Sequence, residues 1–440
     1  MSARRAHPKS RLGCADCKRR RIKCDQKRPH CMNCEKRGLK CSFVIFDPVP
    51  QSRLSVSSQA EETKPSIHVF AQHSLYTDVP APVGTLLDGK IQGALLEGFA
   101  VDDRPRMKIV LHHFATKTVR TFSPGTASDV AWQEFLPSLA KQHGYVLNGI
   151  LAVGCLHLSI LTNEISERDD YQDIAANQMN TGMAQYREEV QNITTSNSEA
   201  LFAFSTTMTT FVLGTAGTEC RNALDSMKKE RLPEDQREDT TTLLIQAICR
   251  IFRAVRGVLV ILVPCYHHIR SGKFKPVLDR DWWPSPVPIT PEELEQDNKL
   301  RSLEKLWAQP GKPYEYCFDS LRRALKDLRD TTALVSRLAA SPFPGDGPND
   351  ETFDWTAIMG WLTHLPLEFI SLLEERRMEA WVLMAHYALL PAKVKVNPWL
   401  DGLATSIFMT SALVIGKENW EWIAWPAAVL KIDLEDVHAE

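Results

Sequence analysis

The chain has 440 residues, of which 44% are hydrophobic and 24% charged, a composition typical of folded globular proteins rather than disordered ones. Its length exceeds that of an ordinary single domain and predicts two or three domains. The net charge of −2 hides an asymmetry, because residues 1–41 hold 14 lysines and arginines against three acidic residues. This segment therefore carries +11 and the other 399 residues carry −13, so a polyanion is the expected partner of the basic segment.

The eleven cysteines are unevenly spread, which argues against a secreted disulfide framework. Six of them lie within 28 residues and the other five are scattered, as expected for a reduced compartment. The N-terminal sequence has no apolar segment of the kind that a secretory signal needs. The most membrane-like stretch, residues 145–162, is interrupted by Asn148 and His157. It predicts a buried helix rather than a membrane span, and no membrane partner is expected.

In chain order, the first segments are polar and irregular. Residues 1–13 form a basic arm that suits either phosphate contact and nuclear import or a simple solvated tail. Residues 14–41 hold the six clustered cysteines. Residues 42–101 are rich in Pro, Ser and Gln and predict a flexible linker. They lack apolar heptads, so no dimerising coiled coil is predicted there.

Residues 102–432 predict one large all-α domain, followed by an acidic tail over 433–440. Apolar residues recur at helical spacing in four runs, with no sustained alternation typical of strands. These runs, and those that follow them, cover residues 107–122, 128–143, 145–161, 171–190, 241–270, 314–338, 355–373, 378–390 and 403–415. Residues 214–240 are polar and charged and predict a mobile surface excursion within this domain.

The cysteine spacing predicts a metal centre. The pattern C-x2-C-x6-C occurs twice, as Cys14, Cys17 and Cys24, then as Cys31, Cys34 and Cys41. A structural zinc ion takes four ligands in a tetrahedron, so two ions need eight ligand positions. Six thiolates fill eight positions only if two of them bridge, and the sequence therefore predicts two zinc ions in one compact cluster.

A run of cations follows the second cysteine and predicts a DNA contact. Five of the six residues from 18 to 23 are basic, namely Lys18, Arg19, Arg20, Arg21 and Lys23. On a short helix beside a zinc core, such side chains can enter the major groove and hold phosphates. A metal-storage or purely structural zinc knuckle would explain the cysteines but not the cations.

Together these residues resemble the fungal binuclear zinc-cluster DNA-binding domain, including Pro29 in the loop between the two halves. The resemblance implies that Cys14 and Cys31 bridge the two zinc ions. It also implies that Arg20 and Arg21 read bases while Lys18 and Lys23 face phosphates. Double-stranded DNA with CGG-like triplets, often in paired half-sites, is the implied target.

The acidic body resembles the regulatory domain of fungal zinc-cluster factors related to the sterol uptake control protein. The resemblance lies in the run from Trp132 to Leu158 and in residues 377–390 and 420–432. It implies an all-α regulatory module with a small apolar effector, but a regulator of a biosynthetic gene cluster has the same layout. Tryptophans that could line a ligand cavity are expected instead to pack in the core, and they are Trp355, Trp361, Trp381, Trp399, Trp420, Trp422 and Trp425.

Catalysis has no support in the sequence, which contains no nucleophile elbow, phosphate loop or dinucleotide fingerprint. The histidine pairs at 112–113 and 267–268 lack metal-site spacing and predict structural or surface roles. The sequence thus predicts a nuclear, sequence-specific RNA polymerase II transcription factor that contacts the transcription machinery, either as a monomer or as a homodimer through its body. The alternatives are a ligand-sensing protein whose zinc cluster contacts other proteins, and an enzyme with a zinc appendage.

Overall fold

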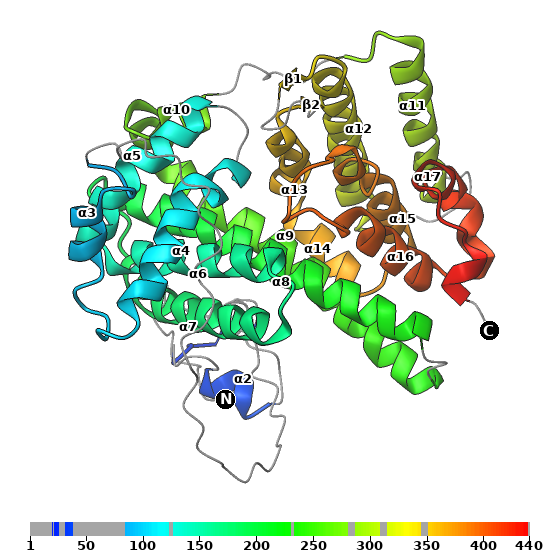
Figure 1. The fold of residues 1–440 in the computed structure, drawn as a ribbon. Helices are drawn as coiled ribbons and strands as arrows, with labels where there is room; N and C mark the ends of the chain where they lie inside the picture. The colour runs from blue at the N-terminus through cyan, green and yellow to red at the C-terminus, as the bar shows by residue number, and fades with distance from the viewer. Residues whose placement is uncertain are drawn as a thin grey trace, which may run out of the picture. The chain divides into compact units, whose positions relative to one another are not determined.

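Two units make up the protein, Met1–Asp78 and Val79–Glu440. The computed structural model describes residues 20, 22–25, 31–37, 84–122, 126–229, 233–279, 287–308, 315–344 and 351–438. In the first unit, helix α2 (Met32–Glu35) lies among the cysteines. The second unit is built of helices, as Figure 1 shows. The predicted all-α class is confirmed there, with one antiparallel pair of two-residue strands, β1 (Phe343–Pro344) and β2 (Glu351–Thr352).

The N-terminal part of the helical unit contains six α-helices and one 3-10 helix. They are α3 (Gly89–Leu95), α4 (Arg104–Thr116), η2 (Thr118–Thr121), α5 (Thr126–Gln142), α6 (Gly144–Leu161), α7 (Ile165–Glu189) and α8 (Ser198–Lys229). The long helix α9 (Glu234–Ser271) and the short α10 (Lys275–Leu278) follow. The predicted helices at 107–122, 128–143, 145–161 and 171–190 correspond to α4 with η2, α5, α6 and α7.

The C-terminal part contains shorter helices. They are α11 (Pro291–Ser302), η3 (Leu303–Leu306), α12 (Phe318–Ala340), η4 (Trp355–Ile358), α13 (Met359–His364), α14 (Leu367–Glu374), α15 (Met378–Tyr387), η5 (Pro391–Lys393), α16 (Leu403–Ile415), η6 (Lys417–Ile423), α17 (Ala424–Leu430) and η7 (Glu435–His438). Helix α11 begins at a capping box in which Thr290 and Glu293 satisfy each other's backbone N–H groups. The sequence did not predict this helix, nor the short α10 and η3 between α9 and α12.

Helix α6 is the buried centre of the N-terminal part and packs against α4, α5, α7 and α8. By length and hydropathy, α6 and α8 could each cross a membrane, but 78% of each apolar window is buried inside the protein. The prediction of a buried helix over 145–162 is therefore confirmed. Two glycines permit the close packing, because a Cβ atom at Gly149 would lie 2.4 Å from Thr207 Oγ1 and one at Gly182 would lie 2.6 Å from Phe204 Cε2.

The prediction of a mobile excursion over residues 214–240 is wrong. Residues 214–229 continue α8, and α9 begins at Glu234. Ala216, Cys220 and Leu224 recur every fourth residue and are almost fully buried, so they form a narrow apolar stripe on the otherwise polar C-terminal part of α8. A helix with so narrow a stripe is stabilised by its packing partner, here α9, rather than by its own amphipathic pattern.

The predicted linker also ends earlier than expected. Helix α3 lies inside the 42–101 segment, and Leu86 and Leu96 on either side of it are completely buried in the core. Asp88 accepts a hydrogen bond from the Lys90 N–H as the helix cap, and the Gln92 side chain donates to the Leu86 carbonyl over 2.8 Å. Leu87, Leu95 and Phe99 also pack against the core, so this short helix is held by tertiary contacts although the surrounding composition resembles a linker. The rest of the predicted linker lies outside the described residues.

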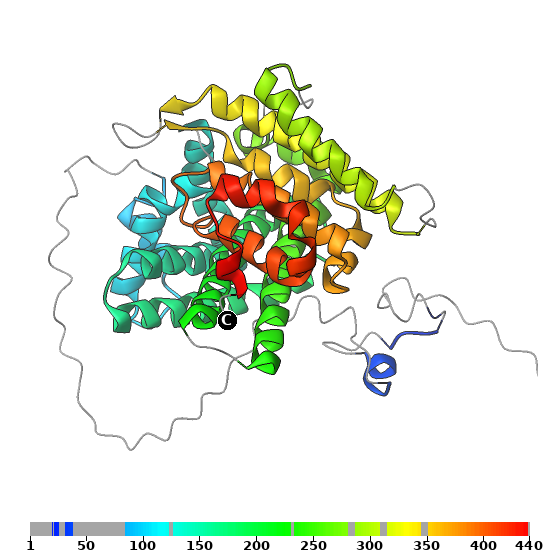
Figure 2. The ribbon, with the colours of Figure 1, turned by 90° about the vertical axis from the view of Figure 1, so that its right-hand side faces the viewer.

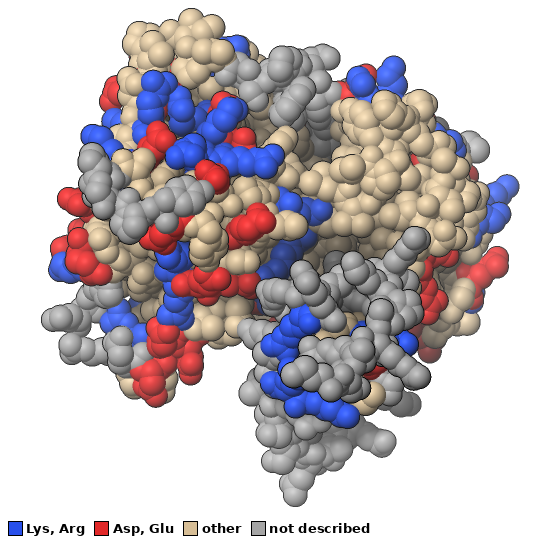
Figure 3. All heavy atoms as spheres, turned by 180° about the vertical axis from the view of Figure 1, so that it is seen from behind, with Lys and Arg blue, Asp and Glu red and all other residues tan. Residues whose placement is uncertain are grey.

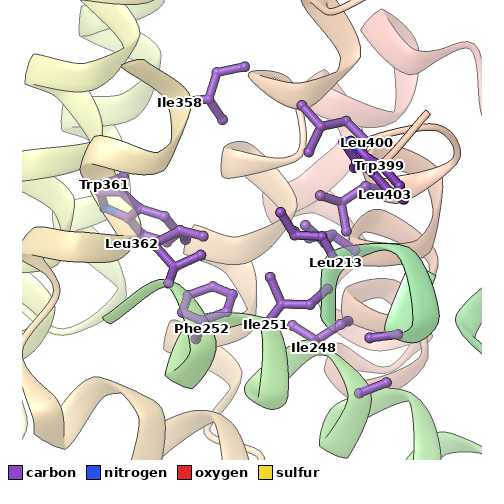
Figure 4. Close-up of a cluster of buried hydrophobic side chains, with 14 of the residues drawn as sticks. Leu213, Ile248, Ile251, Phe252, Ile358, Trp361, Leu362, Trp399, Leu400 and Leu403 are labelled. Atoms are coloured by element: carbon purple, nitrogen blue, oxygen red, sulfur yellow. The ribbon is translucent and has the colours of Figure 1, made fainter. Parts of the chain in front are cut away.

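Helix α9 connects the two parts of the helical unit. It packs along α8 and also contacts α13, α14 and α16. Figure 2 shows the C-terminal helices, from yellow to red, gathered together in front of the blue-green N-terminal ones. Figure 4 shows the apolar cluster at this junction, formed by Leu213, Ile248, Ile251, Phe252, Ile358, Trp361, Leu362, Trp399, Leu400 and Leu403. One continuous core therefore joins residues that are about two hundred positions apart in the sequence.

The tryptophans and histidines fall mainly where the sequence placed them. Trp355, Trp361, Trp381, Trp399 and Trp420 are buried in the core, whereas Trp422 and Trp425 are only partly buried.

The histidine pairs have the structural and surface roles that the sequence predicts. His267 and His268 are exposed on α9. His113 Nε2 lies 3.3 Å from His157 Nδ1, and burial lowers the pKa of His113 to about 4 and that of His157 to about 3. Both imidazoles are therefore neutral packing groups at neutral pH.

Candidate metal centre and nucleic-acid interface

The second cysteine half-repeat forms a tight turn that begins a helix. Cys31 has extended backbone angles (φ −73°, ψ 144°) and is the N-cap of α2. Its carbonyl accepts a hydrogen bond from the Cys34 N–H over 3.0 Å. The turn across the two intervening residues brings both cysteines to the buried side of the segment, as the C-x2-C spacing predicts.

In this segment the cysteines are buried and larger apolar side chains are exposed, which is the reverse of an ordinary small domain. Cys24, Cys31 and Cys34 have exposed fractions of 3%, 0% and 2%, while Ile22 and Met32 are 38% and 41% exposed. A module of this size cannot fold on a hydrophobic core alone and needs a metal or disulfides. Cysteines inside and aliphatic side chains outside are the arrangement that a metal-centred core produces.

The ligand atoms are already gathered closely enough for a metal. The sulfur atoms of Cys24 and Cys31 and a carboxylate oxygen of Asp25 all lie within 4.8 Å of one another. Two thiolates bound tetrahedrally to one zinc ion, each at about 2.3 Å, lie roughly 3.8 Å apart, so a group that spans no more than 4.8 Å is close to the size required. The donor set therefore fits zinc, a borderline-soft ion that prefers thiolates.

Two hydrogen bonds join the first half-repeat to the second. The Asp25 carboxylate accepts from the Met32 N–H, with 3.0 Å to Oδ1 and 3.2 Å to Oδ2. The Asn33 side chain donates to the Lys23 carbonyl over 2.8 Å. A carboxylate at the start of α2 also interacts favourably with the N-terminal end of that helix. The sequence interpretation did not select Asp25 or Asn33, and no local pattern marks Asp25, because it lies six residues before the N-cap Cys31.

The structure describes part of the predicted DNA contact. Arg20 and Lys23 are exposed beside the buried Cys24. Lys36 and Arg37, which the sequence interpretation did not select, are exposed at the end of α2 and add two cations to this unit. The predicted ligands Cys14, Cys17 and Cys41 and the predicted contacts Lys18, Arg19 and Arg21 lie outside the described residues.

Charge is distributed differently over the helical unit. Figure 3 shows acidic and basic side chains sharing the face of the helical unit seen from behind. Several cations of the helical unit are paired, for example Arg106 with Asp170 at 3.1 Å and Arg329 with Asp297 at 2.6 Å. Paired cations attract a polyanion less than unpaired ones, so the helical unit is a weaker candidate for DNA contact than the N-terminal unit.

Family comparisons agree with both units. Residues 12–48 match the fungal Zn(2)-Cys(6) binuclear cluster domain, and residues 109–245 match the fungal specific transcription factor domain. The first match contains all six clustered cysteines, and the second extends from α4 into α9. The chain therefore contains both domains that characterise fungal zinc-cluster transcription factors. No curated protein and no solved structure matches it.

Through its binuclear cluster domain, the protein binds two zinc ions in its N-terminal unit. It is a DNA-binding transcription regulator and not an enzyme, so the zinc ions are structural and perform no reaction step. Zinc bound by thiolates supplies the folding free energy that this small domain cannot obtain from apolar burial. What the chain's own residues contribute is the array of exposed cations fixed next to that core.

The Asp25 contact gives a first testable prediction. Asp25→Ala removes the carboxylate that accepts the Met32 N–H and should destabilise the zinc domain by about 1 kcal/mol. We expect two zinc ions still to bind, but a competing chelator should remove them several-fold faster. Zinc release followed with a colorimetric chelator measures this. Asp16→Ala, which changes the other aspartate of residues 1–41, is the matched control and should not alter the rate. Equal release from both variants would contradict the role of Asp25.

Proposed function

We propose that the N-terminal domain reads specific DNA sequences with a two-zinc cluster held by Cys14, Cys17, Cys24, Cys31, Cys34 and Cys41. In this proposal Cys14 and Cys31 bridge the two ions. Arg20 and Arg21 contact bases, and Lys18, Arg19 and Lys23 contact phosphates. The proposal further places the protein in the nucleus and gives it CGG-like target sites.

The observation that carries the proposal is the pairing of buried thiols with exposed cations on one short segment. Cys24 is buried while Arg20 and Lys23, four and one residues before it, are exposed. The metal-centred core fixes the backbone, so these side chains are presented in a defined geometry rather than on a flexible tail. A fixed array of cations can distinguish base edges, whereas a flexible one recognises only phosphate charge.

The helical domain is proposed to regulate this DNA-binding activity. It has a continuous core, contains no coiled coil in its described helices and carries the match to the fungal specific transcription factor domain. If the protein is a homodimer, its helical domain is therefore the proposed contact. Control of a biosynthetic gene cluster and a sterol response both remain compatible with this domain.

Binding of the full-length protein to DNA selected from a random pool tests the proposal. We expect the affinity for the selected duplex to exceed that for a shuffled duplex by at least about a thousandfold. The affinity should fall linearly on a logarithmic scale as salt rises, with a slope set by the number of phosphate contacts. A chelator should abolish binding and added zinc should restore it. A protein-contact role for the cluster would instead give no preference between the two duplexes.

A further inference from the structure

A pocket of about 370 Å³ lies in the C-terminal part of the helical domain. It is formed by α11, α12, the segment from the end of α15 through η5, and α17, which Figure 1 shows gathered together. Its lining includes His386, Leu390, Lys393, Leu300 and Trp425. The volume is within the range of small-molecule sites, and apolar walls with a few polar groups are typical of them.

His386 supplies a buried hydrogen-bonding group to this lining. The side chain is 3% exposed, and its Nδ1 lies 2.8 Å from the Val382 carbonyl. Because a carbonyl only accepts, Nδ1 must carry the proton and Nε2 is left as an acceptor. Burial lowers the pKa of His386 to about 4, so the ring is neutral at neutral pH. Among the described residues no side chain bonds to Nε2, and a ligand hydroxyl is a suitable donor for it.

Lys393 supplies an ammonium group whose charge is not neutralised by the protein. No carboxylate or hydrogen-bond acceptor contacts its Nζ within the described residues, and burial lowers its pKa. An anionic ligand group would offset this loss of solvation. The other lysine in the lining, Lys299, is paired with Glu295 at 2.7 Å, and its Nζ lies 5.0 Å from the centre of the Trp425 ring.

The remaining acidic side chain of the lining, Glu292, is exposed at the rim. Gln296 and Thr332 also line the pocket, but Gln296 accepts a hydrogen bond from Ser336 and Thr332 donates one to the Leu328 carbonyl. The pocket therefore presents one half-buried cation without a counter-charge and one acceptor nitrogen, beside apolar side chains. Its volume lies at the lower end of the range of small-molecule sites, about 300–1,000 Å³, which favours a small ligand. We propose that this pocket binds a small hydroxylated carboxylic acid with a flat apolar body. The carboxylate pairs with Lys393, the hydroxyl donates to His386 Nε2 and the ring packs beside Trp425.

A wholly apolar effector of sterol type fits this pocket less well. Such a ligand would bury Lys393 without giving it a counter-charge, and would leave His386 Nε2 without a donor. The pocket also joins segments far apart in the sequence, since α11 and α17 both contribute side chains. A bound acid would hold these segments together and so favour one arrangement of the C-terminal helices. A regulatory effect of this ligand rests on the proposed function of the helical domain. Binding of the acid to the pocket does not depend on that proposed function.

Calorimetric titration of the full-length protein without DNA, using 4-hydroxybenzoate as the probe, tests the site. We expect saturable binding to one site. Methyl 4-hydroxybenzoate, which lacks the anionic group, should bind about tenfold to a hundredfold more weakly. Benzoate, which lacks the hydroxyl, should also bind more weakly. These three ligands need no protein variant, so misfolding cannot obscure the comparison.

Two lysine variants test whether 4-hydroxybenzoate binds in this pocket. Lys393→Gln should weaken 4-hydroxybenzoate binding about as much as the methyl ester does. Lys395→Gln, which removes an exposed lysine two residues away, should leave the affinity unchanged. The proposal is overturned if 4-hydroxybenzoate does not bind at millimolar concentration, or if the acid and its methyl ester bind with equal affinity. It is also overturned if the two lysine variants bind the acid with the same affinity, or if ergosterol binds and the acid does not. DNA binding measured without ligand is independent of all four results, so failure here leaves the proposed function standing.

Discussion

Cys31→Ala should remove both zinc ions and abolish specific DNA binding. Cys31 is completely buried, starts α2, and its sulfur lies with that of Cys24 in one group of potential metal ligands. In the proposed cluster it bridges both ions, so its loss would leave neither zinc with four ligands. Zinc binding contributes on the order of 10–16 kcal/mol to the folding of comparable small domains, which exceeds what any other contact in this segment can supply.

Zinc content by atomic emission and DNA affinity by fluorescence anisotropy measure the outcome. The control is Cys265→Ala, which removes a half-buried thiol of α9 outside the N-terminal domain and should keep two zinc ions and full affinity. Thermal unfolding of the helical domain should be the same for both variants, because the two units are separate. A Cys31→Ala protein that retains two zinc ions and normal affinity would show that this residue is not a bridging ligand.

The second large effect is expected at Arg20. Arg20→Ala should cost about 1–3 kcal/mol on the selected duplex and should relax the choice of base at one position. Lys23→Ala is the matched variant, because it also removes one exposed cation from the same segment. It should weaken binding to all sequences alike and reduce the salt slope by about one, as expected for loss of a phosphate contact.

Measuring both variants on selected and shuffled duplexes over a range of salt concentrations separates the two roles. For Arg20→Ala the ratio of the two affinities should fall, whereas for Lys23→Ala it should stay constant. If both variants lose the same free energy on both duplexes, then Arg20 contacts the DNA backbone and base reading must be assigned elsewhere.

The sequence by itself determined the metal chemistry and the fold class. Ligand number and spacing are local properties, so six cysteines in two equal repeats predict two zinc ions without any knowledge of tertiary packing. Helices such as α6 were also predictable, since their apolar residues are dense enough to require burial whatever they contact. Five of the seven tryptophans in the last third of the chain lie in the core as expected, whereas Trp422 and Trp425 are only partly buried and Trp425 lines the pocket.

Only the tertiary structure decided which polar segments of the chain form helices packed on the core. Residues 214–229 continue α8, which packs along α9, and their buried residues Ala216, Cys220 and Leu224 form a stripe too narrow to be recognised from the sequence alone. Helix α3 is likewise held by tertiary contacts against a core that lies elsewhere in the chain. The pocket depends on the same kind of information. Lys393 and His386 become a candidate site only because α11 and α17 enclose them, and sequence periodicity describes one helix at a time.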